Sequence, residues 1–317
     1  MEERFQTKAC YSSLFQSRKL KPLPPGPSQL QAIPGSQLPR SSGTIKQELT
    51  QQTAWVHTSR QTFPSGEIIG GHEAKPHSHP YMAYLAIWDQ ESLKRCGGFL
   101  VREDFVLTAA HCWGSSINVT LGAHNIKKQE RTQQSMPVRR TFCHPDYNPE
   151  NFSSDIMLLQ LERKAKRTTA VQPLRLPSSK AQVKPGQVCS VAGWGRTTPM
   201  GTYSHTLQAV NLTVQEDRKC ESCLRNYYDS TVELCVGDPE IKKASFKGDS
   251  GGPLVCNKVA QGIVSHGPRN GKSPRAFTKV SSFVHWIKKT MRPGTMAYTC
   301  NPRTLGGRGR WITRSRV

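Results

Sequence analysis

The chain of 317 residues lacks any long apolar run. A membrane-spanning helix needs about 20 mostly apolar residues, and no segment approaches this, so we expect no transmembrane segment. Residues 1–65 also lack the short apolar stretch of a signal peptide, so we expect no recognisable signal peptide in this form of the chain. They are rich in Pro, Ser and Gln, and we expect a disordered N-terminal extension.

Acidic residues are scarce. Asp and Glu number 22 against 44 Lys and Arg, which gives a net charge of +22. This excess favours polyanionic partners such as nucleic acid, heparin-like sulfated glycans or anionic membrane surfaces. Basic residues are spread along the chain without the pattern of a DNA- or RNA-binding module, so we expect no specific nucleic-acid partner. The run "RKAKR" at 163–167 is either a solvated face or a glycan-binding site.

A metal-binding framework is also missing. Ten cysteines are widely spaced, and the single CxxC, Cys220 and Cys223, has no second pair at zinc-ligand distance. We therefore expect no metal or other cofactor, and disulfides formed in an oxidising compartment. Three glycosylation sequons, at Asn118, Asn151 and Asn211, agree with a secreted protein.

Between residues 68 and 292, short β-rich segments alternate with Gly, Pro, Asn and Ser, which predicts an all-β barrel or sandwich. The segment "SSFVHWIKKTM" instead predicts a helix, because Phe283, Ile287 and Met291 recur at helical spacing, with Ser281 or Ser282 as its N-cap. Residues 293–317 are rich in Gly and Arg, and we expect a disordered C-terminal extension.

The segment "FKGDSGGPLV" places Ser250 among glycines that permit close backbone approach. Alone it could be a simple turn, and His111 in "LTAAHCW" could be a packed core histidine. Asp155 in "SSDIMLLQL" leads into an apolar strand, where an unpaired carboxylate would be costly. Together the three residues supply a nucleophile, its base and the acid that orients the base.

The motifs "IIGG", "TAAHC", "DIMLLQL", "GWG" and "GDSGGP" occur in this order within residues 66–292. This arrangement resembles the chymotrypsin family of serine proteases. The resemblance implies two six-stranded antiparallel Greek-key barrels with a C-terminal helix, a protease domain at 68–292 and an activation dipeptide at 66–67. His111, Asp155 and Ser250 would then be the catalytic residues.

Within that family, "IIGGHEAKPHSHPYMAY" and "RCGGFL" are similar to the granzymes of cytotoxic lymphocytes. This similarity implies an endopeptidase that cleaves after Asp and promotes apoptosis of target cells through caspase precursors and related substrates. It also implies storage in cytolytic granules, delivery to the target-cell cytoplasm and inhibition by serpins. The alternative is a catalytically silent, unprocessed cationic glycan-binding protein of the same fold, because 67 residues precede the expected new terminus.

The family pattern implies roles around the nucleophile. The backbone N–H groups of Gly248 and Ser250 would form the oxyanion hole. Asp249 would pair with the ammonium of Ile68 after cleavage behind Glu67, unless it is only a turn residue. The implied disulfides are Cys96–Cys112, Cys189–Cys256 and Cys220–Cys235, whereas the states of Cys10, Cys143, Cys223 and Cys300 stay open.

The specificity pocket also follows from the resemblance. Ala244 stands where trypsin-like members have an aspartate, and Arg275 stands where most have glycine. A guanidinium there would bind a substrate aspartate, unless Arg275 is a solvated surface residue. Lys247 would add positive potential, and Ser265 and Gly267 would pair with an extended substrate. His266 and Pro268 replace a tyrosine and an arginine of the granzyme pattern, which leaves the neighbouring subsites open.

Overall fold

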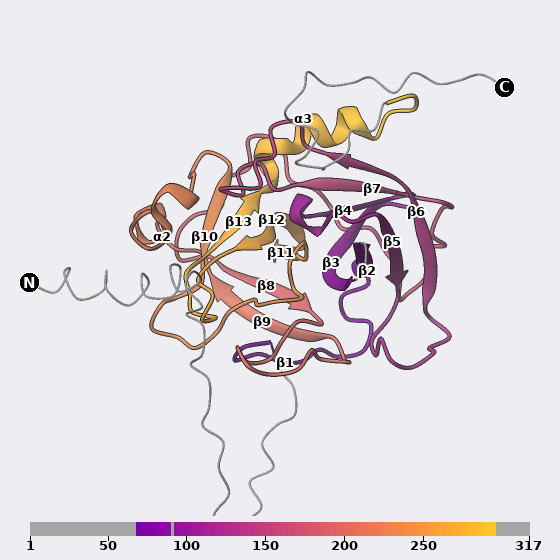
Figure 1. The fold of residues 1–317 in the computed structure, drawn as a ribbon, viewed down its shortest axis with the longest axis horizontal. Coiled ribbons are helices and arrows are strands. Elements are labelled where there is room, and N and C mark those ends of the chain that lie inside the picture. Colours follow the sequence, from indigo (N-terminus) through magenta and orange to yellow (C-terminus); the bar gives the residue numbers. More distant parts are fainter. Residues whose placement is uncertain (1–67, 90–91, 296–317) are drawn as a thin grey trace, which may run out of the picture. The chain divides into compact units, whose positions relative to one another are not determined.

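A computed structural model describes residues 68–89 and 92–295, and the expected terminal extensions lie outside these residues. Six antiparallel strands near the start form a closed barrel (Figure 1). In barrel order they are β2 (Met82–Asp89), β3 (Ser92–Arg102), β4 (Phe105–Thr108), β7 (Met157–Leu161), β6 (Gln134–Cys143) and β5 (Ser116–Leu121). The first of the two expected barrels is therefore present.

The second sheet has seven antiparallel strands. Their order is β1 (His72–Glu73), β9 (Gln208–Thr213), β8 (Val188–Gly193), β11 (Pro253–Cys256), β12 (Val259–His266), β13 (Arg275–Lys279) and β10 (Glu233–Val236). A bridge between Val214 and Val236 joins the end of β9 to β10, and Gln215 N donates to Cys235 O at 2.8 Å. Six strands thus form a ring with β1 beside it, and the expected fold class is confirmed.

The side-chain alternation of a strand builds each barrel core. In β2, Ala83, Leu85 and Ile87 are fully buried inside the first barrel, while Trp88 is exposed. Each large aliphatic side chain buried in this way contributes about 1.5–3 kcal/mol relative to exposure. The second sheet buries a separate cluster that includes Leu254 and Phe277.

The expected C-terminal helix is α3 (Val280–Thr290), drawn in yellow in Figure 1. Its N-cap is Lys279, so the prediction of a serine cap was wrong. Ser281 is buried within the first turn, and Ser282 Oγ donates instead to Thr231 O at 3.0 Å. Phe283 and Ile287 pack into the core of the first barrel, although the helix directly follows the second sheet.

Three shorter helical elements complete the described chain: η1 (Ala110–Cys112), α2 (Asp217–Leu224) and η2 (Arg225–Tyr227). In the part of the chain that the structure describes, no helix has both the length and the apolar character needed to cross a bilayer.

Candidate active site

His111 and Asp155 meet at the end of the first barrel. His111 lies in η1, just after β4, and Asp155 precedes β7, the strand that pairs with β4. The Nδ1 atom of His111 lies 2.7 Å from Oδ2 of Asp155, and the His111 backbone N–H donates to Oδ1 at 2.9 Å. Because a carboxylate only accepts, Nδ1 carries the proton, and Nε2 of the neutral ring is left free to accept one.

Burial and charge pull the two pKa values in opposite directions. Burial alone would lower the pKa of His111, but the charge and hydrogen bond of Asp155 raise it above the usual histidine value. Burial alone would raise the pKa of Asp155, whereas His111 and the hydrogen bonds to the carboxylate lower it. The arrangement therefore favours the ionised carboxylate of Asp155 and stabilises the imidazolium form of His111 relative to a free histidine.

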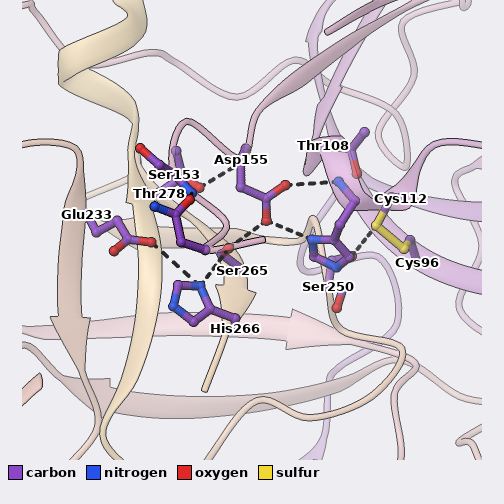
Figure 2. A network of polar contacts seen from close by, with 12 residues as sticks. Cys96, Thr108, Cys112, Ser153, Asp155, Glu233, Ser250, Ser265, His266 and Thr278 are labelled. Carbon is purple, nitrogen blue, oxygen red and sulfur yellow. Dashed lines mark hydrogen bonds and ion pairs between the residues drawn. A yellow bond between two sulfur atoms is a disulfide. The ribbon is translucent and has the colours of Figure 1, made fainter. Parts of the chain in front are cut away.

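Ser250 reaches this site in the turn before β11. Gly97 N donates to its carbonyl oxygen at 2.7 Å, and Sγ of Cys112 lies 3.7 Å from the same oxygen. Since Cys112 follows His111 directly, these contacts bring the second-sheet turn against the segment that carries the imidazole. Figure 2 shows Ser250 beside the Cys96–Cys112 disulfide.

The glycines around Ser250 are required by the backbone. Gly248 has φ of 100°, and a Cβ there would lie 2.8 Å from the Tyr203 ring. Gly251 has φ of 81°, and a Cβ there would lie 2.1 Å from Thr108 Oγ1. The Gly-Asp-Ser-Gly string therefore forms a tight turn packed against both halves of the site.

Asp249 is fully buried, and its carboxylate accepts backbone N–H groups from Phe246 at 2.8 Å and Gly195 at 2.9 Å. A Cβ at Gly193 would approach its Oδ1 to 2.2 Å, which explains the need for glycine in the "GWG" motif. Burial raises the pKa of Asp249 to about 7, although its hydrogen bonds and Arg275 oppose the shift. Ile68 is also fully buried, within the cluster of the second sheet.

Arg275 is buried at the start of β13, with 9% of its surface exposed. Its Nη1 donates to Pro268 O at 3.0 Å, and its guanidinium lies 5.8 Å from the centroid of the Phe246 ring. A Cβ at Gly267 would lie 2.9 Å from Cζ of Arg275, so only glycine leaves room for the guanidinium. The interpretation of Arg275 as a solvated surface arginine was therefore wrong.

Comparisons with known proteins identify the family. The Trypsin family model matches residues 68–287. The chain belongs to the trypsin family of chymotrypsin-like serine proteases. It is 83% identical over 228 residues to Granzyme B of Homo sapiens, covering 72% of this chain and 92% of that protein. Granzyme B(G,H) of Mus musculus is 68% identical over the same shares of the two chains.

A solved structure titled "Structure of GrC" matches with a TM-score of 0.69 and 59% identity, covering 71% of this chain and 99% of that one. The chain is thus a serine endopeptidase with granzyme B-like function, and cleavage after Asp is consistent with these relatives. They do not favour the alternative of a catalytically silent glycan-binding protein.

The sequence predicted only a backbone role for Ser265, whereas its side chain contacts Asp155. Ser265 Oγ donates to Oδ2 of Asp155 at 2.5 Å. A bulge between Val264 and His266, where β12 pairs with β13, accounts for the inward direction of this hydroxyl. Thr278 Oγ1 donates to the Asp155 carbonyl at 2.8 Å, which fixes the backbone of the same residue.

The remaining pocket residues differ in exposure. Ala244 is buried and its N–H donates to Ile69 O at 3.1 Å, so the chain near the expected new terminus pairs with the pocket wall. Lys247 is exposed beside Gly248. Pro268 has a role that the sequence did not predict, because its carbonyl holds Arg275.

All three implied disulfides are present, namely Cys96–Cys112, Cys189–Cys256 and Cys220–Cys235. Cys143 and Cys223 are disulfide-bonded as well, while Cys10 and Cys300 lie outside the described residues. The bond between Cys96 and Cys112 braces the segment that carries His111.

The surface sites predicted from the sequence are accessible. Asn211 is exposed on β9, and Asn118 and Asn151 are partly exposed, so glycosylation at all three stays a prediction. The basic side chains of the run at 163–167 are exposed, while Ala165 within it is buried. This exposure is compatible with both interpretations of the run, and glycan binding there also stays a prediction.

Proposed function

We propose that this protease hydrolyses peptide bonds after aspartate through an acyl-enzyme on Ser250. The buried guanidinium of Arg275 is the observation that carries the specificity. A guanidinium stays charged when it is desolvated, and it offers paired donors that match a carboxylate. Burial lowers the pKa of Arg275 to about 10, so it remains positive at neutral pH. Ala244 supplies no competing negative charge.

The proposed reaction begins with transfer of the Ser250 hydroxyl proton to His111. His111 Nε2 accepts the proton of Ser250 Oγ as the oxygen attacks the scissile carbonyl, and it then gives that proton to the leaving amine. Asp155 keeps the imidazole oriented and stabilises the imidazolium. The backbone N–H groups of Gly248 and Ser250 stabilise the oxyanion, and one such donor is typically worth about 3 kcal/mol. Water then releases the acyl group by the same steps.

Substrate binding uses the strand beside the pocket. The backbone of Ser265 and Gly267 pairs with an extended substrate, and this places its aspartate against Arg275. Lys247 adds positive potential next to the oxyanion hole and favours acidic residues nearby. These roles agree with the burial of Arg275 and the exposure of Lys247.

Activation depends on a new terminus at Ile68. Cleavage after Glu67, the last residue of the activation dipeptide, frees an ammonium that pairs with the buried carboxylate of Asp249. The pair shapes the oxyanion turn and the pocket. The raised pKa of Asp249 supports this role, because the buried carboxylate needs a positive partner to stay ionised at neutral pH.

The cellular role proposed is that of a granule protease. Its substrates are proteins with Asp at the cleavage site, including caspase precursors, and its action in the target-cell cytoplasm promotes apoptosis. Serglycin-type sulfated glycans bind the exposed basic run at 163–167, and serpins inhibit the enzyme. The high net charge supports the glycan partner.

A single substitution tests the chemistry. Ser250→Ala in chain cut after Glu67 should abolish turnover of an Asp chromogenic peptide and labelling by a fluorophosphonate. Ser222→Ala, at an exposed serine of α2, is the matched control and should retain both. Activity that persists in the Ser250→Ala protein would refute the assignment.

A further inference from the structure

A second histidine lies behind the catalytic acid. His266 ends β12, and Glu233 begins β10 with only 2% of its surface exposed. Figure 2 shows Glu233, His266, Ser265 and Asp155 in succession. Neither Glu233 nor the ring nitrogens of His266 take part in the mechanism described above.

The hydrogen bonds of His266 fix one of its protons. Nε2 lies 2.6 Å from the carbonyl oxygen of Tyr227, which can only accept, so Nε2 carries a hydrogen. Nδ1 lies 3.2 Å from Ser265 Oγ and 3.6 Å from Oε1 of Glu233. The Ser265 proton is already directed at Asp155, so Nδ1 faces two oxygen atoms.

Glu233 has one carboxylate oxygen without a hydrogen bond. Oε2 accepts the Asp229 N–H at 2.9 Å, whereas Oε1 is buried and has no hydrogen-bond partner among the described residues. If Nδ1 were unprotonated and Glu233 ionised, the lone pairs of Nδ1 and Oε1 would face and repel each other. The two atoms lie 3.6 Å apart, just beyond hydrogen-bond distance, and a single proton held by the pair removes this repulsion.

Aromatic contacts hold the His266 ring in place. Phe152 stacks on His266, with centroids 5.0 Å apart and an interplanar angle of 20°. The same Phe152 meets the His111 ring edge to face, with centroids 5.9 Å apart. His266 therefore contacts His111 and Asp155 indirectly. Ser265 lies between His266 and Asp155, and Phe152 lies between His266 and His111.

We propose that Glu233 and His266 share one proton and together form a positioning pair that keeps Ser265 directed at Asp155. This inference rests on the proposed function, in which Asp155 orients His111. The pair touches no reacting atom. It acts on the rate through the third hydrogen bond to the Asp155 carboxylate.

The surrounding charges set the pH range of the pair. Burial raises the pKa of Glu233 to about 8, and burial lowers the pKa of His266 to about 4. The titratable and charged groups around the two side chains are Asp155, Asp229, Tyr228, His111 and Arg275. Between these two pKa values the pair holds one proton. Above pH 8 it loses that proton, and the Ser265 hydroxyl can turn from Asp155 to the bare Nδ1.

The decisive variant is Glu233→Gln. The amide group of glutamine donates to Nδ1 at every pH, and its oxygen can still accept the Asp229 N–H. In the full chain, cut after position 67 at an engineered enterokinase site, wild-type kcat should show an alkaline loss with a midpoint near pH 8 that Glu233→Gln lacks. Deprotonation of the Ile68 ammonium at high pH affects both proteins alike. The test is therefore the difference between the two pH profiles of kcat.

Two further variants sharpen the comparison. His266→Phe keeps the stack on Phe152 but has no Nδ1, so adding Glu233→Gln to it should change the profile no further. Glu73→Gln disrupts a second Glu–His pair of the described residues, in which Glu73 Oε1 lies 2.8 Å from His124 Nε2. It is the matched control and should retain the alkaline loss.

A second measurement needs no catalysis. In the uncut full chain labelled with ¹⁵N-histidine, the Nδ1 shift of His266 should move with a midpoint near pH 8, and the Nδ1–H resonance of His111 should follow it. Both movements should be absent in Glu233→Gln. No transition of His266 between pH 7 and 9, or identical alkaline losses in wild type and Glu233→Gln, would overturn the inference. Failure of every cut form to react with a fluorophosphonate would instead refute the proposed function.

Discussion

Ser265 donates its hydroxyl proton to the same carboxylate oxygen of Asp155 that binds His111. The two contacts measure 2.5 and 2.7 Å, and the other oxygen accepts the His111 backbone N–H. Three donors thus fix the plane of the carboxylate from both sheets of the molecule. The orientation of the catalytic imidazole depends on a residue that lies 110 positions from Asp155.

Removal of this donor should weaken catalysis. In Ser265→Ala, Asp155 loses a charge-assisted hydrogen bond of about 1.5–3 kcal/mol, so kcat/KM should fall by about 10- to 100-fold. The backbone of residue 265 is unchanged, and KM should therefore change little. Kinetics with an Asp chromogenic peptide test this, with Ser222→Ala as control. A wild-type kcat in Ser265→Ala would show that the two N–H donors of His111 are enough to hold the Asp155 carboxylate in place.

The acid side of the pH profile should report His111. Because Asp155 raises the pKa of His111, protonation removes the base at a higher pH than it would in free histidine. The kcat/KM should therefore fall on acidification with a midpoint above about 6.5. Asp155→Asn should shift this midpoint downward and lower kcat by at least about 100-fold. An unchanged midpoint in Asp155→Asn would show that the acid-side fall of kcat/KM does not report the His111–Asp155 pair.

Specificity should depend on Arg275. Arg275→Gly removes the guanidinium and should lower kcat/KM for an Asp peptide by at least about 10- to 100-fold, the value of a charge-assisted pair. Labelling of Ser250 by a small fluorophosphonate should persist, because the triad makes no use of Arg275. Unchanged kinetics on the Asp peptide would exclude Arg275 as the specificity residue.

Cleavage after Glu67 should switch the enzyme on. In the uncut chain the nitrogen of Ile68 is an amide and cannot form an ion pair with Asp249. Only protein cut at an engineered enterokinase site should cleave the Asp peptide, and Asp249→Asn should silence the cut form. Equal activity before and after cutting would show that no such switch operates.

Asp249 should also make the stability of the uncut chain depend on pH. Its folded pKa of about 7 lies above that of an unfolded carboxyl, so the folded state binds more protons between about pH 4 and 7. The free energy of unfolding should therefore fall as the pH rises through this range, by about 2–4 kcal/mol. Urea titrations at several pH values measure it, and Asp249→Asn should flatten the dependence.

Each member of the proposed triad lies in a short motif whose order is itself informative, and the structure brings His111 and Asp155 into contact. The strand pattern alone predicts an all-β barrel or sandwich, and the family resemblance carried by the motifs narrows this to two barrels. The sequence could not predict the Ser265 hydroxyl bond, which depends on the bulge between Val264 and His266. The pairing of Glu233 with His266 depends on strands that are distant in sequence. The prediction of a serine N-cap for α3 was wrong, because the helix begins one residue earlier, at Val280, and Ser281 is buried in its first turn.

The placement of α3 has a consequence for biosynthesis. Phe283 and Ile287 complete the core of the barrel that begins at β2, so the first half of the protease emerges from the ribosome with part of its core missing. Translation proceeds at about 5–20 residues per second, which leaves this barrel incomplete for several seconds. A nascent chain that stops before α3 therefore lacks part of the first-barrel core, and the barrel that carries His111 and Asp155 can be completed only after the helix has been synthesised.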